Sequence, residues 1–576
     1  MKKQSSTSRL FSYFKEYKSQ IFIIIVCVLI YTLGRTISPF MSGYIIDKYI
    51  LVGDLQGLLP AVLLVLAIFL STSISGLIQN RVMIKIAGKA IRNLRQDLFA
   101  RLEGLSLKYF DSVPIGELMS RFTNDIDNIS VTLNQSLLEI VSSVLVLIGI
   151  VIFMLFLNIK LAIVTIISTP ITLIISNILA KKTRASFAAT QQKLGELNGY
   201  IEENISSEKV IIAYGMQEDT VNRFSKVNDD LVRTSIKAQT TAGLMAPFMN
   251  GISNINLAII AAYGSYLTLH NQATVGIVVT FINFARQFFQ PLNQLANLYN
   301  QIQLALTGAE RVFEVMDEVP DIQNSPNSIP ADDFEGIVNI SHLDFSYVEG
   351  NPILKDINLH VEKGKMFGII GPTGSGKSTI MNLLPRFYDY QGGKITIDNT
   401  LIKDFKINDL RNRIGMVLQD TVIFTGTIKE NIKFGNLSAS DDDVVEAAKA
   451  ANIHDYIMTL PNKYETMLDS NASALSAGQK QLLTIARTII SKPDILILDE
   501  ATSNIDTRTE IKIQEAMNNM MRGRTSFVIA HRLKTILHAD QIVVLKDGSI
   551  FEQGTHKELL EKNGFYAELY RNQFSI

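Results

Sequence analysis

Six long apolar stretches in the first half of the chain constrain its fold more than any other feature. A helix needs about 20 mostly apolar residues to cross a bilayer. The predicted spans lie near residues 21–46, 58–82, 137–157, 161–179, 244–269 and 275–298. Buried helices of a large soluble protein are the alternative interpretation, but six stretches of this length are too many for it. We therefore predict an α-helical membrane domain over residues 1–317.

The segments between the predicted spans indicate how they are oriented. The connections around residues 47–56, 158–160 and 270–274 are short, whereas the others are long, polar and rich in Arg and Lys. Because basic segments stay on the cytoplasmic side, the long segments and both termini are predicted to be cytoplasmic. The first residues have no short apolar core followed by a small-residue cleavage site, so no removable signal peptide is expected.

The two long cytoplasmic segments are predicted to continue the spans as helices. Each is interrupted once by a short turn, near residues 108–117 in the first and 213–221 in the second. A helix pair that extends far from the membrane, with a short cross-helix at its tip, can act as a lever that docks another domain.

Polar side chains inside the predicted spans are candidates for a translocation pathway. Arg35 lies near the middle of the first span and Arg286 near the middle of the sixth, followed by Gln287 and Gln290. A charge at that depth costs about 2.5–3.5 kcal/mol on insertion scales, so it should face a water-filled cavity or a partner. Polar pairing that serves only packing, or snorkelling to the interface, is the alternative for each of these residues.

The second half of the chain changes to the short β-like runs of a soluble α/β protein. A polar linker over residues 318–335 precedes a predicted nucleotide-binding domain over residues 336–576. The run "MFGIIG" leads directly into "GPTGSGKST", which is a P-loop in the strand–loop–helix context that it requires. The formal net charge of -1 excludes a broadly basic nucleic-acid-binding protein, and no nucleic-acid partner is expected.

The P-loop predicts ATP and Mg²⁺ as cofactors. Its glycines let backbone N–H groups surround the phosphates, Lys377 reaches the β- and γ-phosphates, and the Ser378 hydroxyl binds Mg²⁺. The predicted phosphate-binding residues of this loop are Gly371, Thr373, Gly374, Ser375, Gly376, Lys377, Ser378 and Thr379.

Two further apolar strands end in residues that suit phosphoryl transfer. "DILILDE" ends in Asp499, which would hold Mg²⁺ through water, and Glu500, which would orient or polarise the attacking water. "TSFVIAH" ends in His531, whose imidazole can donate a hydrogen bond to a γ-phosphate. The alternatives are a buried strand that only meets solvent at its acidic end, and a structural histidine.

A second candidate phosphate site is "LSAGQ", residues Leu475–Gln479, which runs into a helical stretch. A Ser/Gly turn with free backbone N–H groups at a helix start suits an anion. One domain with two phosphate-binding turns raises the question of whose phosphate the second one holds.

These motifs together resemble an ABC transporter ATPase domain. They are Tyr347 in "LDFSYVEG", the P-loop, Gln419 in "GMVLQD", "LSAGQ", "ILILDEATSNID" and His531, in this order. Six spans before one such domain resemble an ABC exporter half-transporter, so the resemblance covers nearly the whole chain. It implies that Tyr347 stacks on adenine and that Gln419 contacts Mg²⁺ and senses the membrane domain. The two helix interruptions would be its coupling helices.

The resemblance also implies that the second phosphate site belongs to a partner's nucleotide. Across a dimer, Ser476, Gly478 and Gln479 would face the γ-phosphate on the partner's P-loop, and Asp506 would communicate between the two ATPase domains. The implied catalytic residues are Lys377, Gln419, Glu500 and His531, and the implied Mg²⁺ ligands are Ser378, Gln419 and Asp499. One chain would then carry two half-sites, and hydrolysis would need a dimer.

The chain departs from the family pattern around the signature. Ala477 replaces the usual glycine, and Ser470 and Ala472 stand where a Gly-Glu-x-Gly pattern is familiar. An altered signature region beside an intact Glu500 resembles one subunit of a heterodimeric bacterial exporter, and a homodimer is the alternative.

The expected function is ATP-driven export of amphipathic, drug-like compounds across the bacterial cytoplasmic membrane. A lipid or peptide exporter and an importer built on the exporter layout stay open. The expected partners are a second half-transporter chain, membrane lipids and the cargo. The sequence names neither the cargo nor the partner chain.

Overall fold

The computed structural model of the chain describes residues 5–332, 334–469, 472, 474–499, 506–530 and 533–574. It divides into two compact units, which are described separately. The membrane unit comprises Met1–Glu103 and Ile115–Glu318, and the ATPase unit comprises Gly104–Pro114 and Val319–Ile576. The chain is therefore a helical membrane domain fused to an α/β ATPase domain, as the sequence predicts.

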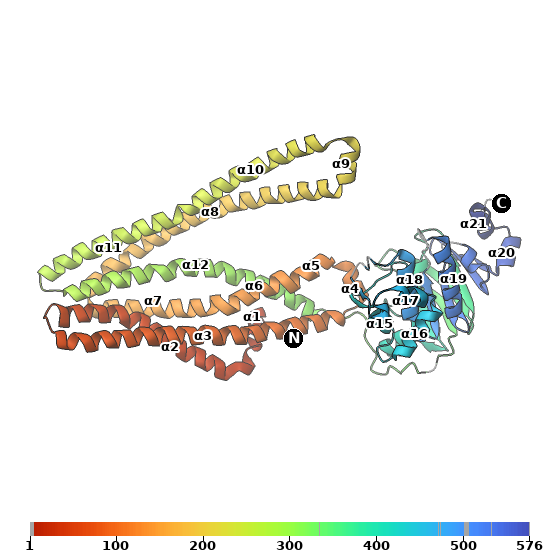
Figure 1. The fold of residues 1–576 in the computed structure, drawn as a ribbon, viewed down its shortest axis with the longest axis horizontal. Helices are drawn as coiled ribbons and strands as arrows, with labels where there is room; N and C mark the ends of the chain where they lie inside the picture. Colours follow the sequence, from red (N-terminus) through yellow and green to blue (C-terminus); the bar gives the residue numbers. More distant parts are fainter. Residues whose placement is uncertain are drawn as a thin grey trace. The chain divides into compact units, whose positions relative to one another are not determined.

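Six long helices form the membrane unit (Figure 1). They are α2 (Lys18–Ile45), α3 (Leu55–Glu103), α7 (Leu137–Leu157), α8 (Ile159–Ser206), α11 (Met245–Leu269) and α12 (Val275–Asp317). Helix α10 (Gln217–Gly243) is also long, with 27 residues. The shorter helices are α1 (Ser6–Ser12), α5 (Ile115–Ser120), α6 (Ile126–Val131) and α9 (Glu208–Tyr214). Two π-helical turns, η3 (Arg121–Asp125) and η4 (Thr132–Ser136), interrupt the approach to α7.

Within the described residues, four helical segments are long and apolar enough to cross a membrane. They are Lys15–Ile50, Leu55–Glu103, Ile115–Leu157 and Asn250–Leu269, and Val275–Phe288 is a shorter apolar helix. Several side chains of α8 and α12 lie outside the description. The predicted spans near 161–179 and 275–298 fall on these two helices.

Small residues let the spanning helices approach closely. A Cβ added at Gly34 in α2 would lie 1.9 Å from the Oγ1 of Thr72 in α3. A Cβ at Gly43 would lie 2.2 Å from the carbonyl oxygen of Gly276, at the start of α12. In lipid no hydrophobic force drives helices together, because the lipid tails are as apolar as the side chains. Helices therefore associate through close packing of this kind. These glycines fix the positions of α3 and α12 against α2.

The two extensions that are predicted to be cytoplasmic end in short helices. Helices α8 and α10 run side by side and are joined by α9, which ends where Gly215 adopts φ +65° (Figure 1). The second interruption was predicted near residues 213–221, but residues 217–221 belong to α10 and the cross-helix starts at Glu208. The left-handed Gly215 ends α9 and does not begin it, which explains the shift.

The first interruption, predicted near residues 108–117, contains α4 (Leu107–Ser112). It ends at Val113, whose extended backbone is the conformation that a following proline, Pro114, imposes. The prediction placed all of residues 1–317 in the membrane domain, whereas Gly104–Pro114 group with the ATPase unit. The reason is that side chains of α4 bond to residues of that unit, as shown below.

The ATPase unit is built on a six-stranded sheet in the order β12-β11-β3-β10-β9-β6. These strands are β3 (Met366–Ile370), β6 (Ile414–Val417), β9 (Ile495–Asp499), β10 (Thr525–Ile529), β11 (Gln541–Lys546) and β12 (Ser549–Gly554). All neighbours are parallel except β12, which pairs antiparallel with β11 at the edge. Every residue of β10 is buried, as expected of a central parallel strand covered on both faces.

A second, antiparallel sheet has the order β2-β1-β4-β5 and shares an apolar core with strands of the six-stranded sheet. Its strands are β1 (Val338–Phe345), β2 (Leu354–Val361), β4 (Gly392–Ile397) and β5 (Thr400–Leu401). The pair β7 (Gly426–Thr427) and β8 (Met467–Leu468) forms a separate ribbon. The helices are α13 (Lys377–Leu383), α14 (Ile407–Arg413), α15 (Ile428–Lys433), α16 (Asp441–Ala450), α17 (His454–Thr459), α18 (Ala477–Ile490), α19 (Thr507–Met521), α20 (His556–Glu561) and α21 (Phe565–Phe574).

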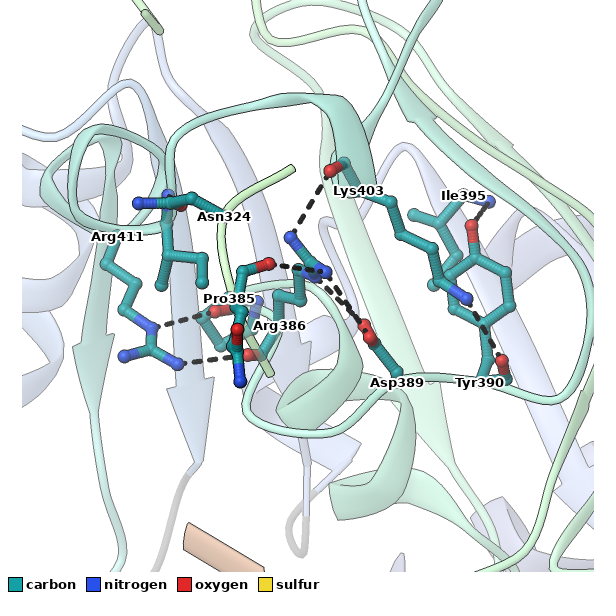
Figure 2. Close-up of polar contacts among 10 residues, drawn as sticks. Asn324, Pro385, Arg386, Asp389, Tyr390, Ile395, Lys403 and Arg411 are labelled. Carbon is teal, nitrogen blue, oxygen red and sulfur yellow. Dashed lines mark hydrogen bonds and ion pairs between the residues drawn. The ribbon is translucent and has the colours of Figure 1, made fainter. Parts of the chain in front are cut away.

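A buried arginine fixes the loop that follows α13 (Figure 2). Arg386 is 5% exposed, and its Nε donates to Asp389 Oδ1 at 2.9 Å. Its terminal nitrogens donate to the carbonyls of Lys403 at 3.3 Å and Gln323 at 3.5 Å. Arg411 Nη2 in turn donates to the Arg386 carbonyl at 3.0 Å. The network ties the interdomain linker to the loop over residues 385–391.

We predict that Arg386→Met destabilises the ATPase domain by about 2–3 kcal/mol, because it leaves the half-buried Asp389 carboxylate without its counter-ion. For a domain of this size the melting temperature should fall by about 4–12 °C in circular dichroism. Lys365→Met is the control, since Lys365 pairs with Asp540 on the surface, where both side chains are exposed, and a surface pair contributes at most about 1 kcal/mol. Equal shifts for the two variants would contradict a special role of the Arg386 network.

Candidate nucleotide-binding site

The parallel sheet gathers the predicted nucleotide residues at one edge. The P-loop follows β3, Asp499 is the last residue of β9, and Gln419 follows β6 closely. In the register of the sheet, Ile529 of β10 lies between Ile369 and Asp499. Carboxyl ends of parallel strands meet at a common edge, where ligands of open α/β sheets bind. Glu500 directly follows β9 and His531 is the second residue after β10, but both lie outside the described residues.

The P-loop backbone depends on two glycines in the left-handed region. Gly374 has φ +82° and Gly376 has φ +100°, which side chains disfavour. A Cβ at Gly376 would also lie 2.6 Å from Leu354 Cδ2. These glycines bring the chain from the end of β3 into the N-terminus of α13, where free N–H groups and the helix dipole suit a phosphate.

Lys377 is held ready at the centre of this loop. Its side chain is buried, and its Nζ donates to the carbonyls of Gly371 and Pro372 at 2.8 Å each. Burial lowers the pKa of Lys377, while the charge of Asp499 opposes that shift. Both contacts are to neutral carbonyls. An incoming phosphate would therefore offer Lys377 an anionic partner in place of a neutral one.

Other loop side chains also fit a nucleotide with its Mg²⁺. The Ser375 hydroxyl is buried and has no hydrogen-bond partner among the described residues. Thr373, Ser378 and Gln419 are exposed to solvent. Hydroxyl, amide and carboxylate oxygens are the ligands that Mg²⁺ prefers. With Asp499, Ser378 and Gln419 therefore form a donor set that could hold the ion, and their assignment as ligands stays a prediction.

Tyr347, the predicted adenine contact, lies against the P-loop helix. Its hydroxyl donates to Thr379 Oγ1 at 3.4 Å, and its side chain keeps 39% of its surface exposed. Its ring packs edge-on against Phe345 at 4.8 Å and Tyr388 at 5.0 Å between centroids. The aromatic ring is thereby held beside the phosphate loop with a surface left for a base.

Tyr388 connects this aromatic group to α4. Its hydroxyl donates to the Asp111 carboxylate, and Lys108 of the same helix pairs with Asp321 of the linker at 3.1 Å. Burial, followed by the hydrogen bond to Asp111, raises the pKa of Tyr388. A pocket of about 160 Å³ lies between these groups and Tyr347. The first interruption helix is thus one aromatic ring away from the predicted adenine contact.

The signature turn is preorganised as a helix cap. Ser476 is the N-cap of α18, where its hydroxyl accepts from Gln479 N at 3.3 Å and its own N–H donates to Gln479 Oε1 at 2.8 Å. Ser476 and Ala477 are exposed, whereas Gly478 is buried. The methyl group of Ala477 therefore points to no packed neighbour and does not disturb the cap.

The remaining residues predicted around the signature and at the start of α19 differ in how they are held. Asp506 is the N-cap of α19, and hydrogen bonds from Thr509 lower its pKa, so the carboxylate stays ionised at neutral pH. Ala472 is buried with φ +43°, a left-handed conformation in which glycine is favoured. Its alanine in place of the family's glycine therefore carries backbone strain. Ser470 lies outside the described residues.

The polar residues predicted in the membrane spans are in different environments. Arg35 is half-buried and donates to the Tyr31 hydroxyl at 3.2 Å, whereas Arg286 is exposed. Gln287 is half-buried, and its Oε1 has no hydrogen-bond partner within the described part of the chain. The side chain of Gln290 lies outside the description. That these residues line a translocation pathway stays a prediction.

Comparison with known proteins identifies the family. Residues 21–292 match the family described as "ABC transporter transmembrane region", and residues 354–503 match "ABC transporter". The chain is 43% identical over 566 residues to "Uncharacterized ABC transporter ATP-binding protein YfiC" of Bacillus subtilis, covering 98% of this chain and 94% of that protein. The chain is an ABC transporter.

Two further likenesses refine this assignment to the exporters. The transporter is 40% identical over 508 residues to "Fatty acid ABC transporter ATP-binding/permease protein" of Mycobacterium bovis, covering 88% of this chain and 80% of the relative. A solved structure described as "Structure of a bacterial Atm1-family ABC exporter with ATP bound" superposes with a TM-score of 0.79 at 29% identity, covering 96% of this chain and 98% of the other. The protein is thus an ABC exporter with fused membrane and ATPase domains, a multi-pass membrane protein whose ATPase is coupled to transport.

The hydrogen bond between Tyr388 and Asp111 was not predicted from the sequence. They lie 277 residues apart, and neither belongs to a nucleotide motif, so the sequence contains no signal that pairs them. The motif residues were found because each motif is local, whereas this contact joins an interruption helix of the first half to the ATPase domain.

We predict that Tyr388→Phe preserves ATP affinity within about twofold, because the ring still packs on Tyr347. Cargo-stimulated ATPase should fall by about tenfold, since a hydrogen bond to a charged group contributes about 1.5–3 kcal/mol. The assay is ATPase activity of the reconstituted exporter with and without cargo. Tyr390→Phe is the control: Tyr390 is equally buried, but its hydroxyl accepts from Ile395 N. Undiminished stimulation in Tyr388→Phe would reduce the contact to packing.

We predict that Ser476→Ala lowers ATPase activity by more than about tenfold, while helix capping accounts for only about 1 kcal/mol of stability. Ser440→Ala provides a matched control, because Ser440 caps α16 with the same reciprocal hydrogen bonds to Asp443. Both variants should lose similar stability in thermal melts, but only Ser476→Ala should weaken ATP-dependent association. If the two variants lose the same activity, Ser476 contributes to the fold alone.

Proposed function

We propose that the chain is one half of a dimeric bacterial exporter that moves amphipathic, drug-like compounds across the cytoplasmic membrane by alternating access. The observation that carries the proposal is the preorganised signature cap with an exposed Ser476, in a chain whose own P-loop lies in a different part of the domain, after β3. An anion-binding turn that is free on the surface suits a phosphate presented by a second chain. ATP then joins two ATPase domains.

The residues of one chain divide the chemistry as follows. Lys377 and the P-loop N–H groups neutralise the phosphates, and Tyr347 offers its ring to adenine. Ser378, Gln419 and Asp499 would hold Mg²⁺, which supplies charge neutralisation between the β- and γ-phosphates. Glu500 orients the attacking water, and His531 donates to the γ-phosphate. From the partner, Ser476, Gly478 and Gln479 complete the site, and Asp506 reports its state to the other ATPase domain.

Closure of the ATPase domains is passed to the membrane unit by the helices at the tips of the two extensions, α4 and α9. This couples one ligand-driven association to a two-state change of the spanning helices. The cargo class is supported by polar residues within apolar spans, whereas the relative named as a fatty acid transporter supports a lipid. A lipid or peptide as cargo is the second candidate. Uptake of cargo into inside-out vesicles, which is expected for an exporter, would be reversed for an importer.

We further propose a heterodimer, in which the partner supplies an unaltered signature sequence. The support is the concentration of departures around one signature: Ala477, Ser470 and the strained backbone of Ala472. Hydrolysis would then occur mainly at the site formed by this chain's Glu500 and the partner's signature. The test is the mass and ATPase rate of this chain purified alone in nanodiscs. An active dimer would establish a homodimer, whereas an inactive chain rescued by co-expression of a second half-transporter would support the heterodimer.

We predict that Glu500→Gln lowers ATP turnover by about 10²–10⁴-fold, the usual contribution of a general base. The variant should still bind ATP and accumulate as a closed dimer, because the phosphate-binding residues are unchanged. Size-exclusion chromatography with ATP and phosphate-release kinetics would measure both effects. Glu510→Gln, in α19 of the same domain, is the control and should keep wild-type turnover. Near wild-type turnover in Glu500→Gln would remove this residue from the mechanism.

A further inference from the structure

A polar cavity lies among helices that are otherwise apolar. It has a volume of about 650 Å³ and is lined by residues of α2, α3, η4 and α7, all but Ile84 and Leu138 of them polar. The size falls within the range of small-molecule sites. All three helical segments that form it are among the candidate membrane spans. Gln79 lies near the end of the predicted span 58–82, and Asn134 and Glu139 lie at the start of the predicted span 137–157. An ionisable residue that faces a cavity between spanning helices points to a substrate pathway.

The cavity wall contains buried hydrogen-bonding groups that lack partners. Gln79 is 5% exposed and Ser142 is 8% exposed, yet the Gln79 Oε1 and the Ser142 Oγ make no hydrogen bond within the described residues. Asn134 donates through Nδ2 to Ser130 Oγ at 3.2 Å, which leaves its Oδ1 unpaired among the same residues. Buried polar atoms are nearly always paired in native proteins. The amide oxygens of Gln79 and Asn134 can only accept hydrogen bonds, so their missing partner is a donor, and the Ser142 hydroxyl can also accept from one.

Glu139 supplies the net charge of the cavity. It is the third residue of α7, directly before the uninterrupted stretch from Ile140 to Leu157, which carries no charged residue. In the part of the chain that the structure describes, its carboxylate forms no ion pair, and none of the lining residues is Lys or Arg. Arg35 approaches the cavity edge at Tyr31, where it donates to the hydroxyl and its guanidinium lies 5.8 Å from the ring centroid.

The local backbone also favours a site. Asn134 belongs to the π-helical turn η4, immediately before α7. Such single wide turns inside helices occur frequently at functional sites, because they re-aim side chains. Leu138 also lines a second hollow of about 340 Å³, whose other lining residues are all apolar, including Phe14, Ile24 and Met83. The polar cavity therefore adjoins an apolar one.

We propose that this cavity binds the protonated amine of an amphipathic cargo, with Glu139 as counter-ion and Gln79, Asn134 and Ser142 as hydrogen-bond acceptors. An ammonium group donates up to three hydrogen bonds and carries the opposite charge, which matches an acceptor-lined site around one carboxylate. A fatty acid would meet a like charge there, so the site selects against that cargo. The inference deepens the proposed function, because it names the chemical class of what is exported.

The test measures binding and not transport, so it is independent of whether export itself is observed. The nucleotide-free dimer in nanodiscs is titrated with dansylcadaverine, which has a free primary ammonium, and with its N-acetyl derivative, which is neutral. We expect the ammonium probe to bind at least tenfold more tightly, and Glu139→Gln to abolish this preference. Equal binding of the two probes, or a preference retained in Glu139→Gln, would overturn the proposal.

Two serines provide a matched control on the same helix. Ser142 and Ser143 are similarly buried, at 8% and 7% exposure, but only Ser142 lines the cavity. Ser142→Ala should weaken the ammonium probe several-fold, while Ser143→Ala should leave its affinity unchanged. Equal effects of the two variants would assign the loss to packing and overturn the role of Ser142.

Two further outcomes distinguish an ammonium site from an inorganic cation site, and ammonium binding from export. Displacement of the probe by sodium chloride but not by choline chloride at equal ionic strength would mean that an inorganic cation occupies the cavity, which would overturn the proposal. Selective probe binding without transport into inside-out vesicles would support the site but contradict the proposed export of such compounds.

Discussion

The hydrogen bonding of the backbone in a bilayer is the constraint on which the rest of this structure depends. Within hydrocarbon every N–H and C=O must be paired inside the chain, and apolar stretches of about 20 residues achieve this as helices. Helices that satisfy their own backbones can also continue into water without interruption. Helices α3 and α8 do this: α3 is 49 residues long and α8 is 48 residues long. The lever arms of the exporter therefore follow from the same requirement as its membrane spans.

The predicted phosphate-binding groups of the ATPase unit are held in place by bonds that a nucleotide can exchange. Lys377 donates to two carbonyls, and the Ser476 hydroxyl accepts from a backbone N–H within its own helix cap. The acceptors of Lys377 are neutral carbonyls and the Ser476 bond is neutral on both sides, whereas a phosphate would bring an anionic acceptor, which strengthens each hydrogen bond. Binding thus replaces weak internal partners with strong external ones. Little entropy is lost, because the side chains are already ordered.

Much of this architecture could be predicted from the sequence, because its signals are local. The P-loop, the strand that ends in Asp499 and the signature cap at Ser476 each lie within a few consecutive residues, and apolar stretches located the helices. The predictions that failed have two causes, one local and one tertiary. The cross-helix α9 was placed too late because Gly215 was not recognised as its C-cap, and the membrane domain was drawn as unbroken because Asp111 gives no sign that it bonds to Tyr388. The unpaired acceptors around Glu139 were likewise invisible, since they come from three helices.

The contact between Tyr388 and Asp111 also suggests why coupling in this exporter can be tight. Tyr388 belongs to the loop that the buried Arg386 holds to Asp389 and to the linker carbonyl of Gln323 (Figure 2). A side chain on a rigid loop transmits a displacement that a flexible loop would absorb. A shift of Tyr347 when adenine stacks on it would therefore pass through the adjoining ring of Tyr388 to the α4 carboxylate. Because packed interiors repack between discrete arrangements and do not deform continuously, a small movement at the base can select one of two positions for α4.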